Sequence, residues 1–252
     1  MVRGLYTSAL GMITKMQRMD VVTNNMANMN TTAYKRDYVV SQAFSNELMH
    51  RLNDPGLRMF RGMTMPIGNI NPGVFVDDVV TSFTQGSLEL SGNPLDIAIF
   101  GQGFFTINVD GEELFTRDGS FTLANGMLLT ATGGRVQGQN GDIILPNGYI
   151  VIDEQGRIFV NEEHVDTLSM TMFSDLHSLR KMQDNLFRTT ELSEQIPFAG
   201  TLQQGFLEGS NVNIVREMVD MITLSRAYET NAKMVTIQDN TLQHAVNDIA
   251  RR

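Results

Sequence analysis

NVNIVREMVDMITLSRAYETNAKMVTIQDNTLQHAVNDI, residues 211–249, is the stretch that decides the fold class. A set of its residues recurs at alternating steps of four and three, like the a and d positions of a coiled coil. These residues are Ile214, Met218, Met221, Ser225, Tyr228, Ala232, Val235, Asp239, Leu242, Val246 and Ile249. Only Ser225 and Asp239 interrupt their apolar character, and the stretch contains no Pro or Gly. The pattern predicts one continuous helix of roughly 55 Å, at 1.5 Å per residue.

Polar residues precede this helix and can cap it. Ser210, Asn211 and Asn213 each carry a side-chain oxygen that could accept a free N–H of the first turn. The candidate assembly residues of the C-terminal helix are Ile214, Met218, Met221, Ser225, Tyr228, Ala232, Val235, Leu242, Val246 and Ile249.

The first thirty residues carry a second pattern of the same kind. Leu5, Ala9, Met12, Met16, Met19, Thr23 and Met26 follow the same alternation, which predicts a helix over residues 2–28. An Asn-rich run, residues 24–32, follows, and its short polar side chains compete with the helical backbone and favour a turn. Asn24 and Asn25 could instead form hydrogen bonds across an interface. The candidate assembly residues here are Leu5, Ala9, Met12, Met16, Met19, Thr23, Asn24, Asn25, Met26 and Asn28.

Neither helix is expected to be stable by itself. Burying eight or nine apolar side chains contributes roughly 12–25 kcal/mol. Ordering about thirty-five residues costs on the order of 50 kcal/mol. The two helices could pair with each other in an ordinary hairpin, but such a pair remains marginal, and neighbouring copies of the chain could supply the missing contact surface.

Composition narrows the function classes. The 252-residue chain has a net charge of −9 and no basic stripe, which argues against nucleic-acid binding. It has no cysteine, so disulfides and thiolate metal sites are excluded. Neither a cleavable signal peptide nor an apolar run long enough to span a bilayer is found, and these signs alone would place the protein in the cytoplasm.

In the middle of the chain, the apolar residues no longer recur with the spacing of a helix. Residues 34–52 have mixed character and could carry a short helix, and residues 53–73, rich in Pro and Gly, are typical of a linker or extended loop. From residue 74 to about 165, short alternating runs are separated by turn dipeptides, which predicts an antiparallel meander. The dipeptides begin at Asp110, Asp118, Asn125, Gly133, Asn140, Asn147 and Gln155.

A short motif occurs on both sides of this region. The sequence QGSLE at residues 85–89 is echoed by QGFLE at residues 204–208. We expect these segments to be the strands that enter and leave the β domain, lying side by side. The alternative is a chance similarity of two pentapeptides.

No constellation for catalysis or for cofactor or metal binding is apparent. The four His lie in separate segments without ligand spacing, and no nucleophile and base pattern is found. Asp96, the one charge in an apolar strand, is expected to pin a turn. The Phe side chains at positions 100, 104, 105, 115 and 121 would form a ligand platform only if they faced outward, and nearly all can be assigned to the core.

Three stretches of the chain together resemble the signature segments of one known family. The first is RGLY at residues 3–6 through NNMANMNT at 24–31 to Tyr34-Lys35, with Ala33 where Gly is usual in the family. The second is FTQG at 83–86 through GQGFF at 101–105 to TRDGSF at 116–121. The third is LEGSNVN at 207–213 through RAYETN at 226–231. DNLF at 184–187 also fits, whereas Gln183 and Glu194 stand where the family tends to have Gly. The family that these stretches resemble is the flagellar basal-body rod family.

The resemblance implies an α+β fold in which long terminal coiled-coil-like helices pair as one layer, with an all-β antiparallel domain inserted between them. Its expected parts are an N-terminal helix (1–33), a linker (34–73), an outer β domain (74–200) and a connecting strand with the C-terminal helix (201–252). Such subunits carry no enzymatic activity, metal or cofactor. They leave the cell through the flagellar type III export apparatus, which overturns the cytoplasmic inference.

The resemblance also implies that the chain forms a homo-oligomeric helical tube in the basal body, contacts other rod and hook proteins, and transmits torque from motor to hook. The length leaves no room for the extra outer domain of hook subunits, so the distal-rod type or a closely similar rod type is favoured, and the pattern does not separate the two. A hook-type axial subunit and a cell-wall-binding β module oligomerised by its helices are the alternatives.

Overall fold

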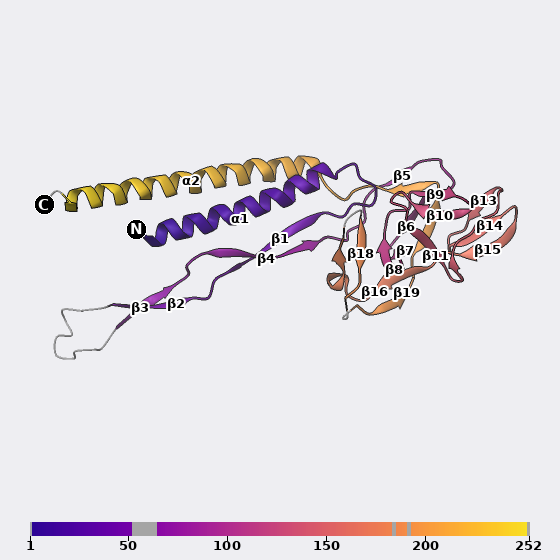
Figure 1. The fold of residues 1–252 in the computed structure, drawn as a ribbon, viewed down its shortest axis with the longest axis horizontal. Coiled ribbons are helices and arrows are strands. Elements are labelled where there is room, and N and C mark those ends of the chain that lie inside the picture. Colours follow the sequence, from indigo (N-terminus) through magenta and orange to yellow (C-terminus); the bar gives the residue numbers. More distant parts are fainter. Residues whose placement is uncertain (1, 52–64, 183–184, 191–192, 251–252) are drawn as a thin grey trace. The chain divides into compact units, whose positions relative to one another are not determined.

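The computed structural model describes residues 2–51, 65–182, 185–190 and 193–250. The chain divides into two compact units that are discontinuous in sequence. One comprises Met1–Thr23, Tyr38–Val80 and Val215–Arg252, and the other comprises Asn24–Asp37 and Thr81–Ile214. The described part therefore has helices from the two ends of the sequence and an antiparallel β unit formed mainly by the middle, as expected (Figure 1).

The first unit contains most of helix α1 (Val2–Ala27) and of helix α2 (Ile214–Ala250). The two helices lie side by side and run in opposite directions (Figure 1). Both begin and end close to the predicted positions, because neither contains a Pro and α1 ends in the Asn-rich run. There the Asn28 side chain donates a hydrogen bond to the carbonyl of Asn24, in competition with the helical backbone.

The rest of the first unit is a set of β ribbons. Their strands are β1 (Asp37–Ala43), β2 (Glu47–Arg51), β3 (Met65–Ile70) and β4 (Val74–Thr81). Strand β1 pairs with β4, and β2 pairs with β3 in antiparallel register. The predicted short helix within residues 34–52 is therefore wrong, because β1 and β2 pair with β4 and β3, two strands that lie beyond residue 64. Of the predicted linker, residues 53–64 lie outside the described part, and most of the remainder is strand β3.

These ribbons pack against α1 through polar and close backbone contacts. The hydroxyl of Thr14, a buried residue, lies 3.1 Å from the carbonyl oxygen of Val74. Arg18 donates a hydrogen bond of 3.0 Å to the hydroxyl of Ser41. Gly73 has φ +158, and a Cβ built on it would lie 2.8 Å from a methyl group of Leu10. This face of α1 is thus occupied by the chain's own strands.

The second unit is an antiparallel β structure. Its strands are β5 (Leu88–Leu90), β6 (Ile97–Phe100), β7 (Phe104–Val109), β8 (Glu112–Thr116), β9 (Phe121–Ala124), β10 (Met127–Thr130), β11 (Arg135–Gly138), β12 (Gly141–Asp142), β13 (Ile150–Ile152), β14 (Arg157–Val160), β15 (Glu163–Thr167), β16 (Met170–Phe173), β17 (Arg180–Lys181), β18 (Leu186–Arg188), β19 (Gln195–Pro197), β20 (Thr201–Gln204) and β21 (Phe206–Glu208), with a 3₁₀ turn at Leu176–Ser178. The largest sheet contains the path β17-β18-β8-β7-β11-β10-β9, and β13, β14 and β15 form a separate meander.

Turn chemistry explains much of this unit. Asp110 and Gly111 both have positive φ, 54° and 88°, as a type I′ hairpin turn requires, and they join β7 to β8. Asn125 and Gly126 do the same between β9 and β10. Asn161 and Glu162, with φ of 52° and 72°, join β14 to β15 without any glycine. The dipeptide spacing predicted the first two turns, whereas the third has no Gly to mark it.

Two clusters of buried side chains hold the second unit together. The larger is aliphatic and includes Ile97, Ile107, Leu128, Val136 and Ile158, all with at most 1% of their surface exposed. The smaller is aromatic and is formed by Phe104, Phe115, Phe173, Leu179 and Phe187, with Phe83 against it. The Phe115 and Phe173 rings meet edge to face with centroids 4.9 Å apart, which is a favourable aromatic geometry.

The two copies of the echoed motif pair with each other, as predicted. Strands β5 and β21 are antiparallel, with Glu208 opposite Leu88 and Phe206 opposite Leu90. Asp96 also behaves as predicted. Its carboxylate accepts a 3.0 Å hydrogen bond from the Asn93 side chain and so holds the turn before β6.

Candidate functional site

A buried cluster of three charges lies in the second unit. The Lys35 ammonium lies 2.6 Å from Oε1 of Glu208, and both side chains are fully buried. Nε of Arg117 lies 3.3 Å from Oε2 of the same carboxylate, an ion pair without the alignment of a hydrogen bond. The backbone N–H of Gly86 donates to Glu208 Oε1 at 2.9 Å, and Lys35 donates to the carbonyl of Thr84 at 2.9 Å. One carboxylate therefore balances two cations out of contact with water.

Local backbone geometry brings these groups together. Ala33 has φ +54, and its N–H donates a 2.7 Å hydrogen bond to the carbonyl of Glu208. The left-handed conformation explains why Gly would suit position 33, since a Cβ there costs roughly 1–2 kcal/mol. Arg117 directly follows β8, and its guanidinium also donates to the carbonyl of Gly101. Lys35 thus comes from the segment after the turn at Ala33, Glu208 from the end of β21, and Arg117 from the loop after β8.

The environment shifts the titration of both cations. Burial lowers the pKa of Lys35 to about 8, and the Arg117 guanidinium adds to this, while Glu208 acts in the opposite direction. Burial also lowers the pKa of Arg117 from its ordinary value, again against the effect of Glu208. An amine that titrates near pH 8 could be reactive if it were accessible, but Lys35 is fully buried and hydrogen-bonded. The arrangement is suited to holding segments together.

Asn211 extends the cluster by joining three backbone segments. Its amide N–H groups donate to the carbonyls of Ser82 at 2.8 Å and of Thr84 at 3.0 Å. Its Oδ1 accepts a 2.7 Å hydrogen bond from the backbone N–H of Arg36. The prediction that Asn211 caps the C-terminal helix is therefore wrong, because its side chain is engaged by the segments beside the charge cluster.

A second polar group lies next to the first. The Tyr34 hydroxyl lies 2.8 Å from Oδ1 of Asn24 and 3.2 Å from Oδ1 of Asn25. Asn25, which is fully buried, exchanges hydrogen bonds with the backbone of Asp37. The ammonium of Lys181 pairs with the Asp37 carboxylate at 2.8 Å and lies 3.9 Å from the centre of the Tyr34 ring. Asn24 and Asn25 thus form hydrogen bonds within the chain.

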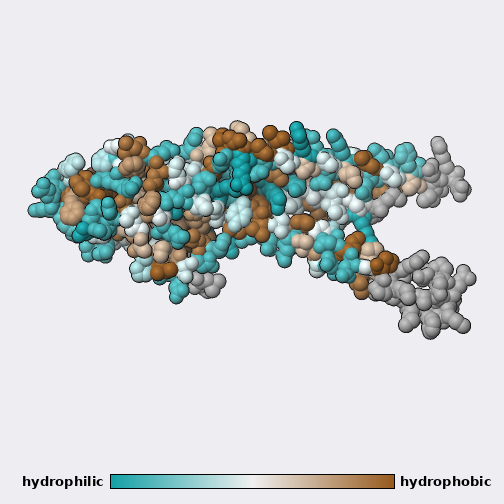
Figure 2. Space-filling view, turned by 180° about the vertical axis from the view of Figure 1, so that it is seen from behind, coloured by the Kyte–Doolittle hydropathy of each residue, from teal (hydrophilic) through white to brown (hydrophobic). Residues whose placement is uncertain are grey.

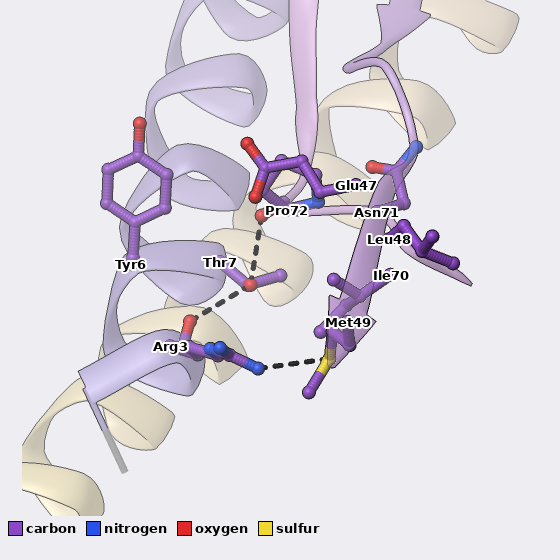
Figure 3. A pocket seen from close by; sticks show the side chains of 9 residues that line it. All are labelled: Arg3, Tyr6, Thr7, Glu47, Leu48, Met49, Ile70, Asn71 and Pro72. Carbon is purple, nitrogen blue, oxygen red and sulfur yellow. Dashed lines mark hydrogen bonds between the residues drawn. The ribbon is translucent and has the colours of Figure 1, made fainter. Parts of the chain in front are cut away.

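The first unit contains a separate hollow of about 420 Å³ between α1 and the β2–β3 hairpin (Figure 3). Its lining residues are Arg3, Tyr6, Thr7, Glu47, Leu48, Met49, Ile70, Asn71 and Pro72. The Arg3 guanidinium reaches the Met49 sulfur at 3.1 Å, and the Thr7 hydroxyl lies 3.0 Å from the Pro72 carbonyl oxygen (Figure 3). Among the described residues that line the hollow, Glu47 carries the one carboxylate.

The candidate assembly residues of α1 are distributed over more than one face. Met16 has 47% of its surface exposed, and Thr23 and Asn24 are also exposed. Leu5, Ala9, Met12, Met19, Met26 and Asn28 are partly covered, and Asn25 is buried. Their role in contacts between copies stays a prediction.

On α2 the positions that are covered in the structure also follow alternating steps of four and three. This series only partly coincides with the predicted heptad series. The covered positions include Glu217, Met221, Leu224, Tyr228, Asn231, Val235, Gln238, Leu242 and Ala245. The two patterns share Met221, Tyr228, Val235 and Leu242. Of the remaining candidates, Ile214 and Ala232 are partly covered, Met218, Ser225 and Val246 are exposed, and the burial of Ile249 is not described. Three of the ten candidates are thus left exposed within one chain, and six are at least partly covered.

Sequence reasoning missed Lys35, Arg117 and Glu208. Glu208 could have been noticed as the last residue of the QGFLE motif, but Glu89, its counterpart in QGSLE, is exposed. The four His form no metal site with Asp or Glu among the residues described. No helix in the described part of the chain is long and apolar enough to cross a membrane.

Comparison with known proteins matches three parts of the chain to family models. Residues 5–35 match "Flagella basal body rod protein", residues 98–160 match "Flagellar hook protein FlgE/F/G D1 domain", and residues 203–248 match "Flagellar basal body rod FlgEFG protein C-terminal". Each matched part supplies one charge of the buried cluster: Lys35, Arg117 and Glu208.

Curated relatives match over nearly the whole chain. The flagellar basal-body rod protein FlgG of Agrobacterium fabrum is 34% identical over 94% of this chain and 95% of its own length. FlgG of Borreliella burgdorferi is 34% identical over 98% of both chains. The flagellar basal-body rod protein FlgF of Caulobacter vibrioides is 32% identical over 98% of this chain and 96% of its own.

Terminal helices, an antiparallel β unit and three matched segments in this order define a structural protein of the flagellum and not an enzyme. The chain belongs to the flagellar basal-body rod protein family, and its place is the basal body of the flagellum.

Proposed function

We propose that this chain is a rod subunit that polymerises into a helical tube and transmits torque from the motor to the hook. In this proposal the terminal segments, residues 1–33 and 201–252, form the inner layer of the tube, and residues 74–200 form an outer domain. Copies meet through heterologous contacts that do not close into a ring, and such contacts generate a helical tube. The assembled shaft also contacts other rod and hook proteins.

The single observation that carries the proposal is the apolar surface that the helices expose. On α1 this surface consists of Tyr6, Ile13 and Met16, and on α2 of Val215, Met218, Val219, Ile222, Met234, Ile237 and Val246. Met218 and Val246, members of the predicted heptad series, have 46% and 63% of their surfaces exposed. On the face drawn in Figure 2, hydrophobic side chains also reach the surface among hydrophilic ones.

The magnitude of this exposed surface is adequate for assembly. Full burial of an apolar side chain contributes about 1.5–3 kcal/mol, so covering ten that are about half exposed contributes roughly 8–15 kcal/mol per subunit. Association costs an estimated 4–15 kcal/mol before such contacts stabilise it. Neighbouring copies could therefore order helices that are marginal within one chain, and the chain could remain unfolded during type III export before it assembles.

Assembly provides the test. Replacing Met218 with Gln and Val246 with Thr together removes about 2 kcal/mol of apolar burial between copies. The critical concentration for fibre formation, measured by sedimentation and electron microscopy, should then rise roughly thirtyfold. Leu90→Gln is the matched control, because Leu90 is also exposed but lies in the β unit. An unchanged critical concentration in the double variant, or an equal rise in the control, would contradict the proposal.

Neither alternative is favoured by a specific observation. A cell-wall-binding module would need an aromatic platform, but Phe104, Phe105, Phe115 and Phe121 are buried and only Phe100 of that set is exposed. A hook-type subunit is less well supported than a rod subunit, because the relatives described above carry the rod names FlgG and FlgF. A fragment of residues 33–208, which lacks both helices, should fail to form fibres.

A further inference from the structure

Two glycines of α1 face two amide side chains of α2. A Cβ built on Gly4 would lie 2.2 Å from Nε2 of Gln238, and one built on Gly11 would lie 2.9 Å from Nδ2 of Asn231. Gly4 and Gly11 are seven residues apart, and so are Asn231 and Gln238. Because the helices are antiparallel, the two contacts repeat one pairing after one heptad along each helix.

We propose that these two glycine–amide pairs fix the register of α1 against α2. An amide that points at the partner helix needs space that most residues would fill with a side chain. Glycine provides that space because it has no Cβ. The device goes beyond the role in the rod proposed above, because it concerns how one chain pairs its own ends and does not depend on polymerisation.

The alternative registers show why two pairs are needed. If α2 slips by one heptad in one direction, Gly4 faces Asn231, but Gly11 faces Leu224. If it slips the other way, Gly11 faces Gln238, but Gly4 faces Ala245. Each slip leaves one amide without its glycine, whereas the observed register accommodates both. The heptad repeat alone does not distinguish these registers, since it is unchanged by a shift of seven residues.

The arrangement favours specificity at the expense of stability. Oε1 of Gln238 is buried and accepts no hydrogen bond from the described residues, which is unfavourable for pairing. A polar residue at a core position of a coiled coil is known to specify register at such a cost. Apolar side chains at positions 231 and 238 would therefore be expected to pair more strongly and less uniquely.

Spin-label distances test the register directly, and the absence of native cysteine makes labelling clean. Labels are placed through Gln17→Cys on α1 and Thr236→Cys on α2, both at exposed positions. A slip of one heptad changes the separation along the helix axes by about 10 Å. The distance distribution is measured for the dilute full-length chain and again with the labelled chain mixed into an excess of unlabelled protein under fibre-forming conditions.

The test variant carries Asn231→Leu and Gln238→Met, which keep side-chain volume and remove the amides. The control carries the same two changes at exposed amides of the same helix, Asn240→Leu and Gln243→Met. We expect one narrow distance for the parent and the control, and at least two distances about 10 Å apart for the test variant. A single unchanged distance in the test variant, or a broad distribution in the parent under both conditions, overturns the proposal. Absence of fibres together with one narrow distance in the dilute parent would contradict only the proposed function.

Discussion

Replacing Glu208 with Gln is the sharpest perturbation of the buried charge cluster. The amide has nearly the same size as the carboxylate, and its oxygen can still accept the Gly86 N–H bond. Among the residues that the structure describes, Glu208 is the one carboxylate paired with Lys35 and Arg117, and the substitution removes its charge. Two buried cations would then face each other without compensation.

The expected loss follows from burial. Removing one partner of a buried ion pair costs about 3–5 kcal/mol, because the remaining charge stays desolvated. Removing an exposed ion pair costs less than about 1 kcal/mol. Glu112→Gln is therefore a suitable control, since the side chains of Glu112 and its partner Arg188 are 50% and 43% exposed. Because a whole domain is typically stable by 5–15 kcal/mol, Glu208→Gln should weaken the β unit severely.

Amide hydrogen exchange of the dilute chain, with urea unfolding followed by far-UV circular dichroism, measures this loss. The chain has no Trp, so intrinsic fluorescence is a poor probe. Exchange protection of β5 and β21 should fall by the equivalent of 3–5 kcal/mol in Glu208→Gln. Adding Lys35→Met should recover part of it, because only one buried cation then remains. A loss as small as that of Glu112→Gln would refute the view that this carboxylate holds the cluster together.

Three further predictions concern the second unit. Lys35 has a pKa of about 8 in the folded chain and an ordinary value of 10.5, so the unfolded chain binds more protons between these values. The difference in unfolding free energy between the parent and Lys35→Met should therefore increase in favour of the parent between pH 8 and 10.5, with a slope of at most about 1.4 kcal/mol per pH unit. A difference that does not change with pH would exclude the lowered pKa of Lys35. Asn211→Ala should lower stability to urea by about 2–4 kcal/mol, because it breaks hydrogen bonds to three backbone groups, those of Arg36, Ser82 and Thr84. A loss under about 0.5 kcal/mol would show that water replaces them. Gly119→Ala should abolish folding at 37 °C in a melting experiment, since its Cβ would lie 1.7 Å from a backbone oxygen. The control Gly111→Ala places its Cβ more than 4 Å from any heavy atom outside the adjacent residues and should cost only about 1–2 kcal/mol of backbone strain. Equal melting temperatures for the two variants would count against the steric argument.

Turns and long helices were predictable because their signals are local. Asp110-Gly111 and Asn125-Gly126 adopt positive φ because these residue types tolerate it, whatever the rest of the chain does. The pairing of residues 88–90 with 206–208 is distant in sequence, but the repeated motif, which overlaps both strands, revealed it.

Other features depend on contacts that carry no local signal. Strands β1 and β2 have a mixed pattern because their partners are other ribbons and not the main core. On α2, Met221, Tyr228, Val235 and Leu242 of the heptad pattern are partly covered within the chain. The pattern did not show that Asn231 and Gln238, rather than Ala232 and Asp239, face Gly11 and Gly4. Lys35, Arg117 and Glu208 are separated by more than eighty residues each, so nothing short of the fold could bring them together.

The pairing of β5 with β21 has a mechanical consequence. The chain enters β5 at Leu88 and leaves β21 at Glu208, and these residues are opposite each other. A force that pulls the chain before Leu88 away from the chain after Glu208 would separate the two strands from this end. The residue pairs would then break one after another instead of sharing the load in shear. The pair that bears the load first contains Glu208, whose carboxylate is paired with Lys35 and Arg117, so the buried charge cluster lies where separation would begin.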